Sequence, residues 1–128
     1  IPMPQPEKIA RLKAAQRMQM WRLKDWLIVT SEVGSYHASV ARALTMLGAD
    51  VAIVGSGNKE GIKLSLRSSK EFFEKTKVHL GRDIAIPVGN FVNGMGGGHA
   101  LAAGINGSGK IEVAIKKCVE LLTIRLGK

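Results

Sequence analysis

The sequence has 128 residues, the size of one ordinary domain, and 45% of them are hydrophobic, which excludes a disordered tail. No continuous run approaches the roughly eighteen apolar residues of a membrane span, and a single cysteine excludes a disulfide framework. Nineteen Lys and Arg residues against ten Asp and Glu residues give a net charge of +9. This surplus favours an anionic partner, in particular phosphate, although a solvated basic surface would give the same balance.

The N-terminal segment, residues 1–26, is predicted to be a linker followed by a connector helix. Its first ten residues, IPMPQPEKIA, contain three prolines and no signal-peptide pattern, which favours the linker of a longer protein. Residues 7–24 contain neither Gly nor Pro and are rich in Ala, Lys, Arg, Met and Gln, which predicts a helix. The lone cysteine and the lack of a signal pattern together predict a cytoplasmic location.

The remainder of the chain, residues 27–128, is predicted to form one α/β domain. Short apolar or alternating runs predict strands at 26–33, 49–55, 62–68 and 102–106. Helical patterns predict helices at 34–47, after Ser68, around Pro87 and at 111–126. A turn at 58–61 joins two of the strands as a hairpin. We therefore expect a mixed β-sheet flanked by helices.

The strand at 62–68 alternates apolar and polar residues. Period two sends Leu64 and Leu66 to a buried face. It sends three polar residues together to the opposite face: Lys63, Ser65 and Arg67. The end of this strand is therefore a candidate contact for a ligand.

Arg67 stands at the end of that strand, beside Ser68 and Ser69. A guanidinium group grips phosphate oxygens with two parallel hydrogen bonds, and the two serines can add hydroxyl or backbone donors. The alternative is an exposed strand face followed by an ordinary helix cap, because Ser68 and Glu71 have the spacing of a capping box.

Residues 93–104 read NGMGGGHALAAG. The backbone N–H groups of Gly96, Gly97 and Gly98 are not obstructed by side chains and can form a concave seat for an anion. The residues HALAA predict a short helix, which would have His99 in its first turn. The glycines would then stand at the N-terminus of this helix, where a negative charge is favoured. We expect a phosphate to bind there. The alternative is that the glycines only permit tight chain packing.

The other titratable residues suggest no catalytic centre. His37 and His79 are expected to have surface or capping roles, and Cys118 falls in the apolar stripe of the last helix. No carboxylate pair, His–carboxylate cluster or nucleophile triad is visible. We therefore predict neither a catalytic residue nor a metal ligand in this chain.

Two stretches carry a family resemblance: LSLRSS at 64–69 and GMGGGHALAAG at 94–104. They resemble the DHHA1 domain, the C-terminal domain of DHH-family phosphoesterases, which include RecJ-type single-strand exonucleases, oligoribonucleases and cyclic-dinucleotide phosphodiesterases. Alanyl-tRNA synthetase relatives have a similar glycine-rich stretch but generally lack the histidine. His99 therefore favours the phosphoesterase branch.

The resemblance implies a mixed α/β unit that faces a catalytic DHH domain across a cleft. The residues it implies for nucleotide and phosphate binding are Arg67, Ser68 and Ser69 on one side and Gly97, Gly98 and His99 on the other. It places the metal centre, Mn²⁺ or Mg²⁺, on Asp and His residues of the DHH domain. No Asp-His-His occurs here, so no cofactor is expected in this chain.

Two functions remain open at this point. The first is the substrate-binding domain of a metal-dependent phosphodiesterase or exonuclease that acts on single-stranded or short oligonucleotides, with cyclic or linear dinucleotides as alternative substrates. Its partners would be the nucleic acid and the DHH domain of the same protein, with no membrane, and this chain alone would be inactive. The second is a non-catalytic nucleic-acid-binding module that contacts RNA or tRNA or takes part in replication.

Overall fold

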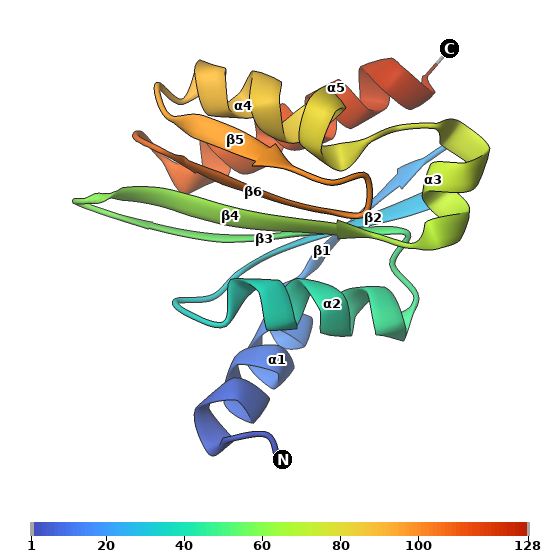
Figure 1. Ribbon diagram of the computed structural model, residues 1–128. Coiled ribbons are helices and arrows are strands. Elements are labelled where there is room, and N and C mark those ends of the chain that lie inside the picture. The colour runs from blue at the N-terminus through green and yellow to red at the C-terminus, as the bar shows by residue number, and fades with distance from the viewer. Residues whose placement is uncertain (1, 128) are drawn as a thin grey trace.

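The computed structural model describes residues 2–127 and shows a β-sheet between two layers of helices (Figure 1). The strands are β1 (Gln19–Leu23), β2 (Trp26–Glu32), β3 (Val51–Asn58), β4 (Gly61–Ser68), β5 (Met95–Gly98) and β6 (Ala102–Gly107). The helices are α1 (Gln5–Arg17), α2 (His37–Leu47), α3 (Lys70–Thr76), α4 (Ile86–Phe91) and α5 (Ile111–Leu126), with a π-helical turn η1 (Leu80–Ala85) that leads into α4.

The sheet has six strands in the order β1-β2-β3-β4-β6-β5. Strands β2 and β3 run parallel and are joined by α2, while β3 pairs antiparallel with β4 through the hairpin expected at 58–61. The α/β class with a mixed sheet is therefore confirmed. The helices expected at 34–47 and 111–126 and the strands expected at 26–33 and 62–68 are confirmed with small shifts at their ends.

The predicted helix over 7–24 is wrong from residue 18 onward. Residues 19–23 instead form β1, which pairs antiparallel with β2 from Gln19 opposite Thr30 to Leu23 opposite Trp26. The composition favours a helix, but a partner strand one tight turn away overrides this weak local preference. The predicted boundary between a connector (residues 1–26) and the α/β domain (residues 27–128) stays a prediction. Strand β1 lies before this boundary but belongs to the same sheet as β2. Residues 1 and 128, the outer limits of the two predicted segments, lie outside the described residues.

Two hydrophobic cores hold the helices to the sheet. The larger one lies between the sheet and the layer formed by α3, η1, α4 and α5, and it buries Leu64, Leu66 and Cys118. The smaller one lies under α1 and α2 and buries residues that include Val40 and Val54. Within residues 2–127, no helix combines the length and the apolar character that crossing a membrane requires.

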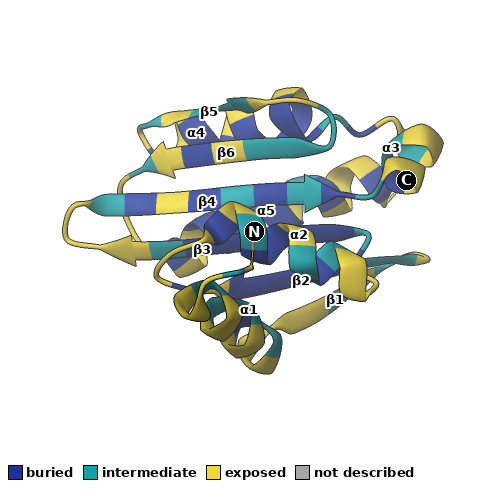
Figure 2. Cartoon of the chain, turned by 60° about the horizontal axis from the view of Figure 1, so that its bottom comes forward, coloured by how far each residue is buried: buried dark blue, intermediate teal, exposed yellow. Residues whose placement is uncertain are grey.

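Helices α1 and α2 cover only part of their face of the sheet (Figure 2). Helix α2 connects β2 to β3 and packs against both β3 and β4, while α1 packs against β2 and α2. Strands β6 and β5 carry no helix on this face. The surface of β6 and β5, with the partly exposed polar residues of β4 beside it, is left available to a ligand.

Candidate nucleic-acid interface

The surface formed by β6, β5 and the partly exposed side chains of β4 is called the open face here. Alternation along each strand selects its residues: Lys63, Ser65 and Arg67 from β4, Ala102, Gly104 and Asn106 from β6, and Met95 and Gly97 from β5. All of them are exposed or half-buried, whereas their neighbours along β4, such as Leu64 and Leu66, are buried in the larger core. The predicted alternation of β4 is thus confirmed.

Arg67 and His99 lie at the same end of the open face. Arg67 is opposite Ala102, and the backbone N–H of His99 donates to the carbonyl oxygen of Ala102 at 2.8 Å. Two strand spacings of about 4.8 Å put the Arg67 and His99 backbones about 10 Å apart. Among the described residues, the Arg67 guanidinium has no hydrogen bond or ion pair. It is therefore available to an anion at this end of the face.

Ser68 and Ser69 do not join Arg67 on the open face. Ser68 is buried on the opposite face of β4, next to Leu66, because side chains alternate along a strand. Its hydroxyl has no hydrogen-bond partner among the described residues. Ser69, not Ser68, caps α3, since its hydroxyl accepts from the N–H of Phe72 at 3.1 Å. The predicted capping box is therefore wrong: the cap stands one residue later, and the third helical residue is Phe72 rather than a glutamate.

The predicted helix over HALAA is wrong, and the glycines are not at a helix N-terminus. Residues Gly96–Gly98 belong to strand β5, and residues 99–101 form the turn that leads into β6. The N–H of Gly81 donates to the carbonyl oxygen of His99 at 3.1 Å, which fixes the turn. Pairing with β6 on one side and close packing of η1 on the other override the helix-forming letters.

Two of the three glycines are explained by packing, as the alternative interpretation held. A β-carbon on Gly96 would stand 1.7 Å from the carbonyl oxygen of Ala85, so η1 could not approach β5. Gly98 has a φ of +139° and a β-carbon there would stand 2.5 Å from the carbonyl oxygen of Ala102. The backbone of this stretch pairs with β6, so the glycines are strand residues and not the first residues of a helix.

Gly97 and Gly104 have no such packing reason. They are directly opposite each other in the β5–β6 ladder, and both lie on the open face. A β-carbon on Gly97 would meet nothing within 4 Å, and one on Gly104 would make only an ordinary contact of 3.6 Å with the carbonyl oxygen of Leu64. Glycine inside a strand weakens it, and it often marks a place where a ligand approaches the backbone closely. This bare pair lies between Arg67 and the far end of the face.

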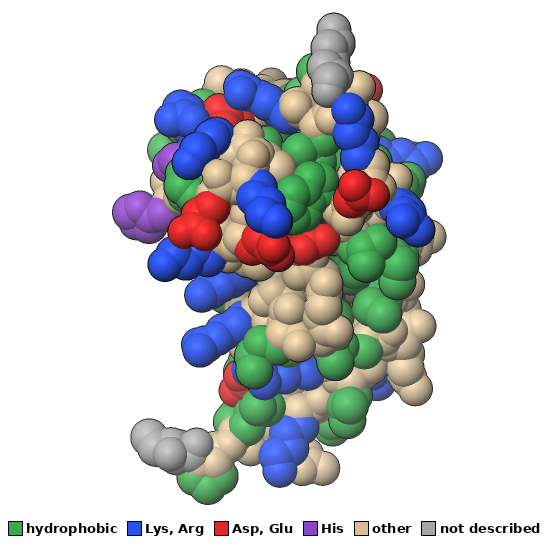
Figure 3. Space-filling model, turned by 90° about the vertical axis from the view of Figure 1, so that its right-hand side faces the viewer, with side chains coloured by type: hydrophobic (Ala, Val, Ile, Leu, Met, Phe, Trp, Pro, Cys, Tyr) green, Lys and Arg blue, Asp and Glu red, His purple; other side chains and the backbone are tan. Residues whose placement is uncertain are grey.

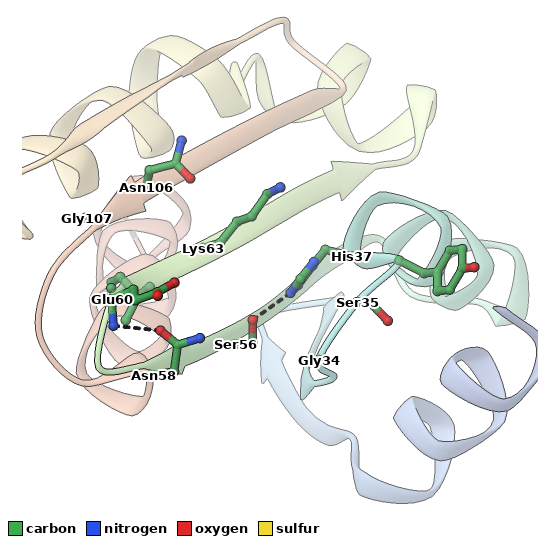
Figure 4. Close-up of a pocket in the computed structure, with 12 residues that line it drawn as sticks. Gly34, Ser35, His37, Ser56, Asn58, Glu60, Lys63, Asn106 and Gly107 are labelled. Carbon is green, nitrogen blue, oxygen red and sulfur yellow. Dashed lines mark hydrogen bonds between the residues drawn. The ribbon is translucent and has the colours of Figure 1, made fainter. Parts of the chain in front are cut away.

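A polar pocket opens at that far end, between the start of α2 and the β3–β4 hairpin (Figure 4). We call it the α2 pocket, and its volume is about 500 Å³. Its polar lining includes His37, Ser56, Asn58, Glu60, Lys63 and Asn106. Lys63 and Asn106 belong to the open face as well, so the pocket and the face are continuous.

His37 was expected to have a surface or capping role, but it is a buried wall of the α2 pocket. Its Nε2 lies 2.8 Å from the hydroxyl of Ser56. Burial lowers the pKa of His37, the charge of Lys63 lowers it further, and a hydrogen bond with the backbone of Val33 opposes the shift. The ring is therefore neutral near pH 7. No sequence signal predicted this, because His37 and Ser56 meet only through the β2–α2–β3 crossover.

Figure 3 views the right-hand side of Figure 1 and shows Lys and Arg side chains spread over this side of the molecule, several of them along its left-hand edge. Within residues 2–127 no group of three His, Cys, Asp or Glu side chains could hold a metal ion. The described residues therefore offer no ligand set for a resident Mn²⁺ or Mg²⁺.

Comparison with known proteins places this fold and face in context. No family model matches the sequence. An uncharacterized protein of Methanocaldococcus jannaschii is 36% identical over 102 residues, which are 78% of this chain and 30% of that protein. The chain therefore spans less than a third of the length of this curated relative.

Several solved structures share the fold. The C-Ala domain of alanyl-tRNA synthetase from Aquifex aeolicus is 26% identical, with a TM-score of 0.65 over 83% of this chain and 99% of that one. An exopolyphosphatase-related protein from Bacteroides fragilis is 17% identical, with a TM-score of 0.64 over 99% of this chain and 38% of that one. A pGpG-specific phosphodiesterase from Vibrio cholerae is 16% identical, with a TM-score of 0.55 over 92% of this chain and 38% of that one.

These structures identify the class of the domain. The mixed sheet and the architecture shared with these structures show a DHHA1-like fold, as the two sequence stretches predicted. The same fold occurs within phosphoesterase-related proteins and within an alanyl-tRNA synthetase.

Proposed function

We propose that this chain is the substrate-binding domain of a metal-dependent phosphodiesterase or exonuclease that acts on single-stranded or short oligonucleotides. The observation that carries the proposal is the bare Gly97–Gly104 pair beside the unpaired Arg67. A sugar–phosphate backbone can lie flat against the two glycines while the guanidinium holds a phosphate with two hydrogen bonds. His99 adds a ring at the same end of the face.

In this proposal the chain contributes positioning and electrostatic attraction. A metal ion, Mn²⁺ or Mg²⁺, would activate water in a separate DHH domain of the same protein. The residues described here hold the neighbouring nucleotide in place, which lowers the entropic cost of the reaction. The purified chain alone is expected to have no hydrolytic activity, and Mn²⁺-dependent hydrolysis by it would contradict the proposal.

The names of the structural neighbours support an oligonucleotide ligand. One neighbour is a phosphodiesterase specific for pGpG, a linear dinucleotide, and another belongs to a synthetase of alanyl-tRNA. The net charge of +9 favours the same class of partner.

The test is a binding titration followed by fluorescence anisotropy, with a labelled single-stranded oligonucleotide and its duplex. Arg67→Ala should weaken single-strand binding about tenfold, since hydrogen bonds to charged groups contribute about 1.5–3 kcal/mol. It should also reduce the slope of log affinity against log salt by about one. Arg22→Ala is the matched control, because Arg22 is exposed on β1 at the other edge of the sheet. Equal affinities of both variants would overturn the site.

A second function, a non-catalytic module that contacts tRNA or other RNA, is favoured by one observation. The C-Ala domain has the fold over almost its whole length and at 26% identity. The full-length protein that contains this chain separates the two functions. Release of mononucleotides in the presence of Mn²⁺ favours the enzyme, whereas tRNA binding without hydrolysis favours the module.

A further inference from the structure

We propose that the α2 pocket binds a nucleoside of the same oligonucleotide whose phosphate lies at Arg67. This rests on the proposed function and deepens it, because it makes the preferred ligand at least a dinucleotide.

The pocket lies on the path of a strand that follows the open face. Residues Ser56, Lys63 and Asn106 are directly opposite one another across β3, β4 and β6, so they form one polar row on the floor of the pocket. Lys63 lies four residues before Arg67 on β4, which corresponds to about 13 Å along the strand. A phosphate at Arg67 and a nucleoside in the pocket are therefore separated by about the length of a dinucleotide.

The chemistry of the lining fits a neutral polar group better than a second phosphate. Lys63 contributes one positive charge and Glu60 one negative charge, while His37 is held neutral. The amide groups of Asn58 and Asn106 offer both donors and acceptors, which suit a base edge and sugar hydroxyls. Figure 4 shows Lys63 extended along β4 between Asn106 and the His37–Ser56 pair. From there its ammonium group can reach a linking phosphate.

The walls of the pocket are fixed before a ligand arrives. His37 is only 9% exposed and its ring is hydrogen-bonded to Ser56. The carboxamide oxygen of Asn58 accepts from the N–H of Glu60 at 2.8 Å, which holds the hairpin tip. A volume of about 500 Å³ lies within the range of small-molecule pockets, so a nucleoside can enter.

The experiment compares two probes, 5′-phosphorylated diadenylate and AMP, in calorimetric titrations. Asn106→Ala should weaken binding of the dinucleotide about fivefold, the effect of one lost hydrogen bond. It should leave AMP binding at the Arg67 end unchanged. Asn90→Ala, an exposed residue on α4, is the matched control and should change neither. A dinucleotide affinity unaffected by Asn106→Ala, or an equal loss for both probes, overturns the α2 pocket.

Nuclear magnetic resonance gives an independent measurement that requires no substitution. The imidazole resonances of His37 should shift when the dinucleotide binds and should not shift with AMP. The variant Arg67→Ala separates the two proposals. If the dinucleotide binds to this variant as to the wild type, the proposed Arg67 site fails, and if it shifts the His37 resonances in neither protein, the α2 pocket fails.

Discussion

Adjacent glycines in β5 should respond oppositely to the same substitution. Gly96 lies against η1, where a new β-carbon would stand 1.7 Å from the carbonyl oxygen of Ala85. Gly97 faces open space, with nothing within 4 Å of the corresponding position. Gly96→Ala should therefore destabilise the domain, and Gly97→Ala should not.

The expected magnitudes follow from these distances. Forcing a methyl group against a backbone carbonyl moves η1 or β5 and costs about 3 kcal/mol. The lower entropy of the unfolded alanine chain offsets about 0.4–1 kcal/mol of this. The net loss for Gly96→Ala is then about 2–3 kcal/mol. Gly97→Ala has only the favourable contribution, and it should gain about 0.4–1 kcal/mol.

Urea denaturation followed by circular dichroism measures both changes. With a slope of about 1.5 kcal/mol/M, the midpoint of Gly96→Ala should fall by about 1.5 M. The midpoint of Gly97→Ala should stay the same or rise slightly. The reasoning would be refuted by a Gly96→Ala midpoint equal to that of the wild type, or by a loss of more than about 1 kcal/mol in Gly97→Ala.

Two further predictions concern buried side chains in the helical layer formed by α3, η1, α4 and α5. Asp83 is almost fully buried and contacts Arg82, Arg125 and the N–H of His79. Burial alone would raise the pKa of Asp83, but the hydrogen bonds from Arg82 and His79 and the two arginine charges together hold it below its ordinary value. Asp83→Asn should therefore cost about 1–3 kcal/mol at pH 7. Because the carboxylate stabilises the fold only above its lowered pKa, the difference from wild type should shrink as the pH falls below about 4. Equal differences at pH 7 and pH 3 in urea titrations would argue against this. Burial raises the pKa of the Cys118 thiol to about 12. The native protein should therefore resist a disulfide exchange reagent at pH 8 and react only after unfolding, whereas rapid labelling of the native protein would contradict the buried position.

Local patterns predicted those parts of the fold in which burial alternates or repeats along one element. The period of two in β4 correctly separated Leu64 and Leu66 from Lys63 and Arg67. The apolar stripe of α5 correctly predicted a buried Cys118. In both cases the pattern lies within one stretch of the sequence, so it could be recognised without knowing which helix or strand packs against that stretch.

Local patterns failed where a partner element decides the conformation. Residues 19–23 have the composition of a helix but pair with β2, and HALAA has the composition of a helix but forms a turn and the start of β6. The propensity of single residues amounts to tenths of a kcal/mol, which pairing with an adjacent strand readily exceeds.

For the candidate site, too, some features follow from the sequence and others only from the tertiary structure. By itself the sequence determined the α/β class and the polar face of β4 with Arg67. Only the tertiary structure decided that Gly96 and Gly98 serve packing while Gly97 and Gly104 stay bare, that Ser68 lies on the buried face, and that His37 lines a pocket. The physical reason is that the pattern of neighbouring residues along the chain determines which face of a helix or strand a side chain occupies. The atoms that contact the side chain come from segments that only the folded sheet brings together.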